Sequence, residues 1–457
     1  MKNYDVKNIR FTVLGAGRSG LAVAKLLKNS GADVFLSDAS PKNKLLYFNE
    51  EEFAKLQIPY ELGGNTDRIF DAEYFVTSPG IPPNSEIFLK AFDKGIKILS
   101  EIEIAYRFCD APIIAITGTN GKTTTTELTG QIFRDAGKDV HVCGNVGLAF
   151  SEIIPKLTNQ SVVVLEVSSF QLEFISEFRP EAAMILNITQ DHIDWHGSFE
   201  KYALAKYRIN LNQTSDDLFV VNYDDGLLRE NINNFRGIKG AFSSLTKPGG
   251  SVQNRAYLKA GSIFYDAGRD EKIISTNDIF IRGSHNVMNS MAAILAAKRF
   301  GINSESIANT LRTFRGVEHR IEPVREIDGV KYYNDSKATN YDSLYVALES
   351  FEGNIILIMG GKKGENNFGT VDELVKSRVK MICAIGESRD AIYDRYSKDI
   401  KVKKHDTLED AVKAAYKESK KGDFVLFSPG YKSFDMFDNY EHRGKAFKEI
   451  VNNLNGK

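Results

Sequence analysis

The segment PIIAITGTNGKTTTT, at residues 112–126, constrains the fold more than any other part of the chain. The apolar run at residues 113–116 predicts a buried strand, and the glycines that follow predict a tight turn into a helix. In such a unit the backbone N–H groups of the turn and the positive end of the helix face an anion together. Lys122 adds a cation for the outer phosphates, and the Thr123 hydroxyl is placed to hold Mg²⁺. The segment therefore predicts a site for a nucleoside triphosphate.

One position departs from the strict phosphate-loop pattern, because Ile116 stands where that pattern has a glycine. The alternative interpretation is a chance glycine turn beside a threonine-rich helix. Since the strand, the lysine and the hydroxyl all occur in register, we interpret the segment as a variant phosphate loop.

Bulk composition limits the other classes of function. A chain of 457 residues predicts about three domains, and 59 basic against 60 acidic residues give no global field to attract nucleic acid or an anionic membrane. Cys109, Cys143 and Cys383 lack metal-site spacing and are too few for a disulfide framework, which favours a reducing cytosol. The sequence contains no signal-peptide core and no apolar run of membrane-spanning length. We therefore expect a cytoplasmic protein without a membrane span or a nucleic-acid partner.

The first 110 residues contain a second nucleotide-binding pattern. The strand expected at residues 9–14 leads into GAGRSG, a helix, and a further strand that ends at Asp38. This is the dinucleotide-binding fingerprint, with an acidic residue placed for a ribose hydroxyl. Three interpretations stay open: NAD, another nucleotide on the same backbone, or helix–strand packing alone. A later strand ends in TSPGIPP, residues 77–83, which we expect to border the same crevice, although a surface turn is the alternative.

Polar residues follow the predicted strands of the central region. Glu166 ends one strand, and His192 follows the next. Because ligands of an open parallel sheet lie at the carboxyl ends of its strands, both side chains are expected near Lys122 and Thr123. Glu166 can bind Mg²⁺ through oxygen, and His192 can be a ligand to a second ion. The alternatives are a helix N-cap carboxylate and a hydrogen-bonded loop residue, but two such residues at successive strand ends favour metal.

Lys206 lies on the apolar side of the helix expected at residues 199–209, beside tyrosines. Burying an ammonium group is costly without a partner, so one interpretation is that the side chain extends to solvent. The other is a lysine whose pKa is lowered for chemistry. The sequence pattern leaves both open.

Strands and helices alternate again after residue 316, and the strand ends there are rich in Lys, Ser and Thr, which suits a small anion. We therefore predict an α/β protein of three domains. A Rossmann-like domain is expected at residues 1–110, a central P-loop ATPase-type domain with a mostly parallel sheet at 111–316, and a Rossmann-like C-terminal domain at 317–457.

Taken together, these motifs resemble those of the Mur ligases, the ATP-dependent amide-forming enzymes of peptidoglycan precursor synthesis. GTNGKTTT is similar to the phosphate loop of that superfamily, which accounts for Ile116. The branch that adds D-glutamate looks most similar, through EVSSFQLE, DHIDWH, AKYRI, GSHNVMN, EHRIE, NDSKATN and SFDMFDNYEHRG. The resemblance implies that ATP phosphorylates the carboxylate of UDP-N-acetylmuramoyl-L-alanine and that the D-glutamate amine attacks the acyl phosphate. It also implies a monomeric enzyme that uses Mg²⁺ and supports cell shape and division.

The resemblance assigns roles to individual residues. It places catalysis at Lys122, Glu166, His192 and Lys206, and metal binding at Thr123, Glu166, His192 and Lys206, the lysine as a carbamate. The ATP-binding positions are Gly118, Thr119, Asn120, Gly121, Lys122, Thr123, Thr124, Asn286, Arg320 and Asp335. The positions for the UDP substrate, which replaces NAD in this family, are Arg18, Ser19, Asp38, Ser78, Pro79, Gly80 and Asn145. The amino-acid pocket is assigned Thr339, Lys363, Ser433, Phe434, Tyr440 and Lys337, the last of which also matches a nucleotide-contacting position.

Three departures from the family pattern stand out. Gln190 takes the place of an acidic residue before Asp191. Gly364 stands where a lysine or arginine grips the side-chain carboxylate of the glutamate, so Lys363 is expected to replace it after a loop shift of one residue. SPGYKS replaces the usual SPACAS and is expected to place Tyr431 and Lys432 beside the pocket, where the lysine is a second source of the missing charge.

Two other functions stay open at this point. An NAD-dependent dehydrogenase rests on GAGRSG and Asp38 but leaves the phosphate loop, Glu166 and His192 unexplained. A related ligase of another branch would add a different amino acid or act on a folate. The N-terminal nucleotide pattern argues against the folate enzymes, and the sequence lacks a DNPR-like loop for diaminopimelate.

Overall fold

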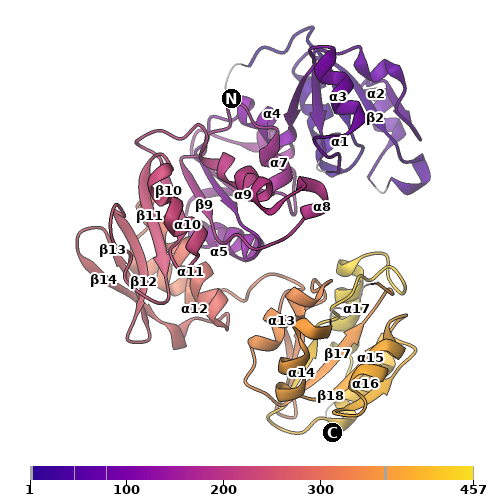
Figure 1. Ribbon diagram of the computed structural model, residues 1–457, viewed down its shortest axis with the longest axis vertical. Helices are drawn as coiled ribbons and strands as arrows, with labels where there is room; N and C mark the ends of the chain where they lie inside the picture. The colour runs from indigo at the N-terminus through magenta and orange to yellow at the C-terminus, as the bar shows by residue number, and fades with distance from the viewer. Residues whose placement is uncertain (1–3, 46, 79, 365–367, 456–457) are drawn as a thin grey trace. The chain divides into compact units, whose positions relative to one another are not determined.

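The computed structural model describes residues 4–45, 47–78, 80–364 and 368–455. Three β-sheets and the helices around them organise these residues (Figure 1). Contacts divide the chain into two units, residues 1–279 with 285–313 and residues 280–284 with 314–457, and each unit is described by itself. Within the described ranges, no helix combines the length and the apolar character needed to cross a membrane.

The N-terminal sheet is parallel throughout, with strand order β3-β2-β1-β4-β5. Its strands are β1 (Arg10–Leu14), β2 (Asp33–Asp38), β3 (Tyr60–Leu62), β4 (Tyr74–Thr77) and β5 (Lys97–Ser100), and its helices are α1 (Arg18–Asn29), α2 (Glu50–Lys55), α3 (Glu86–Asp93) and α4 (Glu101–Phe108). The strand order reverses at β1, and ligands of such sheets bind at that point. A Cβ on Gly15 would lie 2.6 Å from Ser78 Oγ, so the absence of a side chain lets the loops after β1 and β4 approach each other there.

The central sheet has the order β14-β13-β12-β11-β10-β9-β6-β8-β7. Its strands are β6 (Ile113–Thr117), β7 (Asp139–Gly144), β8 (Ser161–Glu166), β9 (Ala182–Ile185), β10 (Leu218–Asn222), β11 (Ile238–Ser243), β12 (Asn254–Lys259), β13 (Ser262–Asp266) and β14 (Asp270–Ser275). Strand β6 is buried over its whole length and pairs in parallel with β8 and β9, with Ile116 opposite Glu166. The loops after these three strands therefore meet at one edge of the sheet.

The helices of the central part are α5 (Lys122–Asp135), α6 (Phe150–Ile153), α7 (Ser169–Glu173), α8 (Ile193–His196), α9 (Phe199–Tyr207), α10 (Gly226–Asn231), α11 (Ser284–Arg299) and α12 (Ser304–Thr313). Strands β12, β13 and β14 form an antiparallel extension of the sheet. Ala260 and Gly261, which join β12 to β13, have φ angles of 47° and 66°, as a two-residue hairpin turn requires.

The C-terminal sheet has the order β15-β16-β20-β17-β18-β19, and only β15 among these strands is antiparallel to its neighbour. Its strands are β15 (Glu322–Ile327), β16 (Val330–Asn334), β17 (Ile355–Gly360), β18 (Val379–Ile385), β19 (Lys401–Lys404) and β20 (Phe424–Phe427), and its helices are α13 (Tyr341–Glu349), α14 (Asp372–Arg378), α15 (Arg389–Tyr396), α16 (Leu408–Glu418) and α17 (Tyr440–Asn452). Apolar clusters cover both faces, as expected of buried parallel strands. The predicted fold class is confirmed, while the predicted domain boundaries stay a prediction.

Candidate active site

The phosphate loop joins β6 to α5 as the sequence predicts. Gly121 has a φ angle of 84° and directly precedes the first residue of α5, so a helix N-terminus follows the turn at once. The Nζ atom of Lys122 donates to the carbonyl oxygens of Gly118 (2.9 Å) and Thr119 (2.8 Å). A Cβ on Gly121 would lie 2.5 Å from Asn289 Oδ1 in α11. The left-handed backbone and this close approach to α11 therefore both favour glycine at residue 121.

Side chains from two other segments hold the loop in place. The N–H groups of Thr119 and Asn120 donate to the backbone oxygen (2.9 Å) and the Oδ1 atom (2.8 Å) of Asn187, which follows β9. Asn286 is buried in α11, and its Oδ1 accepts a hydrogen bond from Asn289 Nδ2 (3.2 Å). The structure thus connects the predicted ATP-binding residue Asn286 to the loop through Asn289. The first turn of α5 buries the remaining predicted loop residues, Thr123 and Thr124.

Glu166 ends β8 and is almost completely buried, with 2% of its surface exposed. Its Oε1 atom accepts a hydrogen bond from Asn145 Nδ2 (2.9 Å), and its backbone oxygen accepts one from Asn145 N–H (2.9 Å). A Cβ on Gly144 would lie 2.2 Å from the same backbone oxygen. The structure therefore brings together a predicted metal ligand and a predicted contact to the UDP substrate, which sequence reasoning treated separately.

Lys206 points from α9 toward the phosphate loop and is 2% exposed. Its Nζ atom donates to the backbone oxygen of Gly118 (2.9 Å) and lies 4.6 Å from the ring centre of Tyr202. Burial, and secondly the nearby charge of Lys122, lower the pKa of the Lys206 amine well below its usual value. The interpretation that Lys206 extends to solvent is therefore wrong, and its surroundings disfavour the charged form of the amine.

His192 directly precedes α8 and lies in the left-handed region, with a φ angle of 52°, and its side chain is half-exposed. The ring of Phe170 packs against the rings of His192 (4.9 Å between centroids), Trp195 (4.7 Å) and His196 (5.6 Å). His196 Nε2 lies 3.0 Å from Ser169 Oγ, and burial lowers the pKa of His196 to about 4. Sequence reasoning missed His196, although its place one helical turn after His192 was a signal that both belong to one structure.

Asp38, at the end of β2, closes the GAGRSG turn. Its Oδ2 accepts a hydrogen bond from Ala16 N–H (2.6 Å), and its Oδ1 accepts one from Ser40 N–H (2.7 Å). Ser78 N–H donates to the backbone oxygen of Leu14 (3.0 Å). The predicted residues Ser19, Ser78 and Gly80 therefore lie around the reversal of strand order, while Pro79 lies outside the described residues.

Arg18 connects the first nucleotide-binding turn to the loop that carries Asn145. Its guanidinium group donates to the backbone oxygen of Gly147 and to Tyr47 Oη (2.9 Å), and it lies 4.9 Å from the Tyr47 ring centre. Most predicted UDP-substrate residues thus belong to one connected region of the first unit. Tyr47, which is exposed, was not foreseen.

Asp335 is a buried carboxyl group of the second unit. It is 4% exposed, and its carboxylate accepts hydrogen bonds from Ser428 Oγ (2.7 Å) and Ile321 N–H (3.1 Å). Burial raises the pKa of Asp335 to about 7, against the opposing effects of the Ser428 hydroxyl and the Arg320 charge. The two predicted ATP-binding residues of this unit, Arg320 and Asp335, therefore influence each other.

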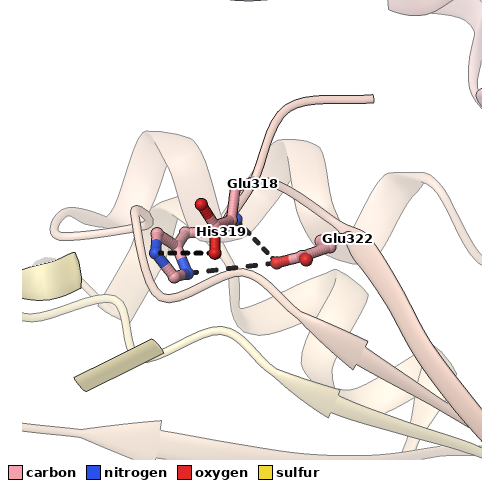
Figure 2. A group of neighbouring side chains, drawn as sticks. All are labelled: Glu318, His319 and Glu322. Atoms are coloured by element: carbon pink, nitrogen blue, oxygen red, sulfur yellow. Dashed lines mark hydrogen bonds and ion pairs between the residues drawn. The ribbon is translucent and has the colours of Figure 1, made fainter. Parts of the chain in front are cut away.

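The residues around Arg320 form a group with metal-like geometry (Figure 2). Potential ligand atoms of Glu318, His319 and Glu322 lie within 4.8 Å of one another. These carboxylates already form ion pairs with the Lys448 ammonium, and Asn334 Nδ2 donates to Glu322 Oε2 (3.0 Å) and lies 2.9 Å from His319 Nδ1. Because a lysine already supplies the positive charge, we assign the group to loop structure and not to metal binding.

The residues predicted for the amino-acid pocket also lie in the second unit. Lys337 Nζ lies 5.9 Å from the Tyr440 ring centre, and Tyr440 begins α17. Ser433 is buried, whereas Phe434 is 62% exposed. The remaining two are Thr339, which is partly exposed, and Lys363, which is exposed and whose N–H donates to Glu387 Oε2 (3.0 Å).

Tyr431 belongs to the core of the second unit, and its place beside the amino-acid pocket stays a prediction. It is 4% exposed within an apolar cluster, and its hydroxyl shares a hydrogen bond with that of Tyr341. Lys432 is exposed, and its backbone oxygen accepts a hydrogen bond from Lys362 N–H (2.9 Å), which ties the two variant loops together. The aromatic residue of SPGYKS thus fills core volume, whereas Lys432 keeps an exposed charge.

The raised pKa of Asp335 gives a pH prediction. Because the folded state binds this proton more tightly than the unfolded state, the free energy of unfolding should fall as pH rises from about 4 to about 7, by on the order of 4 kcal/mol. Asp335→Asn removes this titration, so its unfolding free energy should fall less over that range. Urea unfolding of both proteins between pH 4.5 and 8 measures the difference, and parallel curves would contradict the assigned burial cost.

Comparisons with known proteins agree with this geometry. Family models match the MurD N-terminal domain at residues 10–87, the Mur ligase middle domain at 116–297 and the Mur ligase glutamate ligase domain at 319–430. Among solved structures, MurF ligase from Thermotoga maritima in complex with ADP has a similar fold, with a TM-score of 0.59, 18% identity and 99% of each chain covered. UDP-N-acetylmuramate–alanine ligase from the same organism gives a TM-score of 0.58 at 19% identity, over 97% of this chain and 99% of its own.

Curated relatives match at higher identity and over nearly the full length. UDP-N-acetylmuramoylalanine–D-glutamate ligase of Thermoanaerobacter sp. (strain X514) is 42% identical, over 98% of this chain and 99% of its own. The protein of the same name from Clostridioides difficile (strain 630) is 41% identical, over 98% of this chain and 100% of its own. These matches exclude the dehydrogenase alternative. The chain belongs to the Mur ligase family, in the group of the UDP-N-acetylmuramoylalanine–D-glutamate ligases.

Proposed function

We propose that the chain catalyses the ATP-dependent addition of D-glutamate to UDP-N-acetylmuramoyl-L-alanine. The γ-phosphoryl group of ATP passes to the carboxylate of the alanine, and ADP leaves. The D-glutamate amine then attacks the acyl phosphate, so that an amide bond forms and phosphate and a proton are released. The observation that carries the proposal is the 42% identity, along the full chain, to relatives with this activity in their name.

The main role of the chain's residues would be to stabilise the negative charge on the transferring phosphoryl group. Lys122, at the N-terminus of α5, donates to the loop carbonyls and would move to the phosphates. The buried Thr123 hydroxyl and Glu166 carboxylate are hard oxygen donors of the kind Mg²⁺ prefers, so they fit a first ion. His192 and Lys206, the latter as a carbamate, would hold a second ion. Bound Mg²⁺ would neutralise phosphate charge.

The substrates divide among the three predicted domains. Residues 1–110 would bind the UDP portion, 111–316 would bind ATP, and 317–457 would bind D-glutamate. The reversal of strand order beside Asp38, Arg18 and Ser78 supports a nucleotide in the first domain. Arg320 and Asp335 would contact ATP from the C-terminal domain. We also infer a monomeric cytoplasmic enzyme with a part in cell-wall synthesis, cell shape and division.

The direct test is phosphate release with Mg²⁺, ATP and UDP-N-acetylmuramoyl-L-alanine, comparing D-glutamate, L-glutamate and D-aspartate. Phosphate should appear only when both the UDP substrate and D-glutamate are present. ATP turnover that is indifferent to both would contradict the proposal.

A ligase that adds another amino acid is the second candidate. The exposed Lys363 and Lys432, on two loops tied together by backbone hydrogen bonding, are the observation that favours it. A response to L-glutamate or D-aspartate in the same assay would keep the ligase and assign the changed specificity to these loops.

A further inference from the structure

The loop that carries Arg320 combines two residues with unfavourable backbone angles and two neighbouring carboxylates of like charge. His319 and Ile321, on either side of Arg320, have φ angles of 65° and 44°, in the left-handed region that residues with a Cβ avoid. Glu318 and Glu322 point toward the same His319 ring (Figure 2). Such an arrangement persists only when surrounding contacts hold it in place.

Helix α17 supplies those contacts. Lys448 forms ion pairs with Glu318 and with Glu322 Oε1, at 3.0 Å for the second. One turn earlier, Gly444 lies under the His319 ring, where a Cβ would be 2.2 Å from Nδ1. Because Gly444 has no side chain, the helix can pack closely against the loop. The Lys448 ammonium group holds the two together and compensates the charge of both carboxylates.

The held loop in turn fixes residues assigned to ATP. Ile321 N–H donates to Asp335 Oδ1 (3.1 Å), and the backbone oxygen of His319 accepts from Lys337 N–H (3.0 Å). Glu322 Oε2 accepts from His319 N–H (2.9 Å) and therefore fixes the backbone on the other side of Arg320. Asp335 and Lys337 are thus hydrogen-bonded directly to the loop that Lys448 holds.

We propose that Lys448 is a positioning residue for ATP use, which acts through Glu318 and Glu322 to hold the loop of Arg320 in its binding conformation. The inference rests on the proposed function, in which Arg320 and Asp335 contact ATP. Lys448 itself need not touch ATP. Without its ammonium group the two carboxylates repel each other, and the loop loses the contact that offsets its backbone cost.

The first test compares Lys448→Met with Lys448→Arg and with Lys445→Met, which removes an exposed charge of the same helix that acts on Glu318 more weakly than Lys448 does. Lys448→Met should raise the KM for ATP roughly tenfold, a loss typical of a partly buried ionic hydrogen bond. The KM for the UDP substrate and the Tm should change little. Lys448→Arg should recover most of the ATP affinity, and Lys445→Met should raise the KM for ATP much less than Lys448→Met does.

The second test removes the repulsion itself. In a Lys448→Met background, Glu318→Gln should lower the KM for ATP back toward the wild-type value, whereas Glu318→Gln alone should raise it, which is a coupled double-mutant cycle. An unchanged KM for ATP in Lys448→Met, additive effects in the cycle, or an equal effect of Lys445→Met would overturn the inference. If Lys448→Met does not fold, the Lys448→Arg variant and the double variant decide alone. A wild type without D-glutamate-dependent turnover would instead overturn the proposed function.

Discussion

Replacing Lys122 with methionine is expected to lower kcat roughly a thousandfold while leaving the fold intact. The side chain lies at the start of α5 with its Nζ atom on the carbonyl oxygens of Gly118 and Thr119, so its cation stands at the loop where phosphate charge would develop. Methionine keeps the length of the side chain and removes the charge. Because the interaction strengthens as negative charge moves during phosphoryl transfer, kcat should fall more than the affinity for ATP.

Single-turnover phosphate release separates this effect from product release, and a thermal melt checks the fold. Lys138→Met, at an exposed lysine just beyond the other end of α5, is the matched control and should retain wild-type kcat. A Lys122→Met enzyme with kcat within threefold of the wild type would show that the loop does not serve phosphoryl transfer.

The parts of the site that the sequence could predict are those encoded within one short segment. The β6–α5 unit needs only an apolar run, a glycine turn and a helix start, and all three lie within residues 112–126. The position of Glu166 near the site could be predicted because it ends a strand, and ligands of open parallel sheets bind at the carboxyl ends of the strands.

Contacts between distant segments could not be predicted, because they depend on how the sheets and helices pack. Lys206 meets Gly118 across 88 residues, and Asn145 meets Glu166 across 21. An amphipathic pattern places Lys206 on the inner face of the helix. It does not predict whether the amine donates to a backbone carbonyl oxygen or extends to solvent. The hydrogen bond between the hydroxyls of Tyr341 and Tyr431 could not be predicted for the same reason, since it depends on how the core packs.

Substituting Lys206 should lower activity without lowering stability. Lys206→Met is expected to lower kcat on the order of a hundredfold to a thousandfold, because it removes the amine that would become a metal-binding carbamate. The same change should leave the Tm equal or raise it, because methionine fills a similar volume without the cost of a buried amine. Loss of activity without loss of stability is the signature of a residue retained for chemistry.

The lowered pKa of Lys206 determines whether the free energy of unfolding rises or falls with pH. The folded state binds this proton less tightly than the unfolded state, so between the lowered pKa and about 10.5 the wild-type free energy of unfolding rises with pH. In CO2-free buffer the stability advantage of Lys206→Met should therefore shrink as pH rises from 7 to 10. An advantage independent of pH would contradict the lowered pKa of Lys206.

The carbamate itself has a separate test, because a neutral amine can attack CO2 to form an N–C bond with release of a proton. Wild-type protein equilibrated with ¹³CO2 should show a carbamate carbon signal that is absent from Lys206→Met. In Lys206→Ala, which leaves space beside Gly118, added acetate should restore part of kcat by supplying the missing carboxylate. Acetate should not restore Lys122→Met, whose missing group is a cation. If acetate has no effect on Lys206→Ala and the labelled signal is absent from the wild type, Lys206 acts as an amine, and its hydrogen bond to Gly118 becomes its main contribution to the phosphate loop.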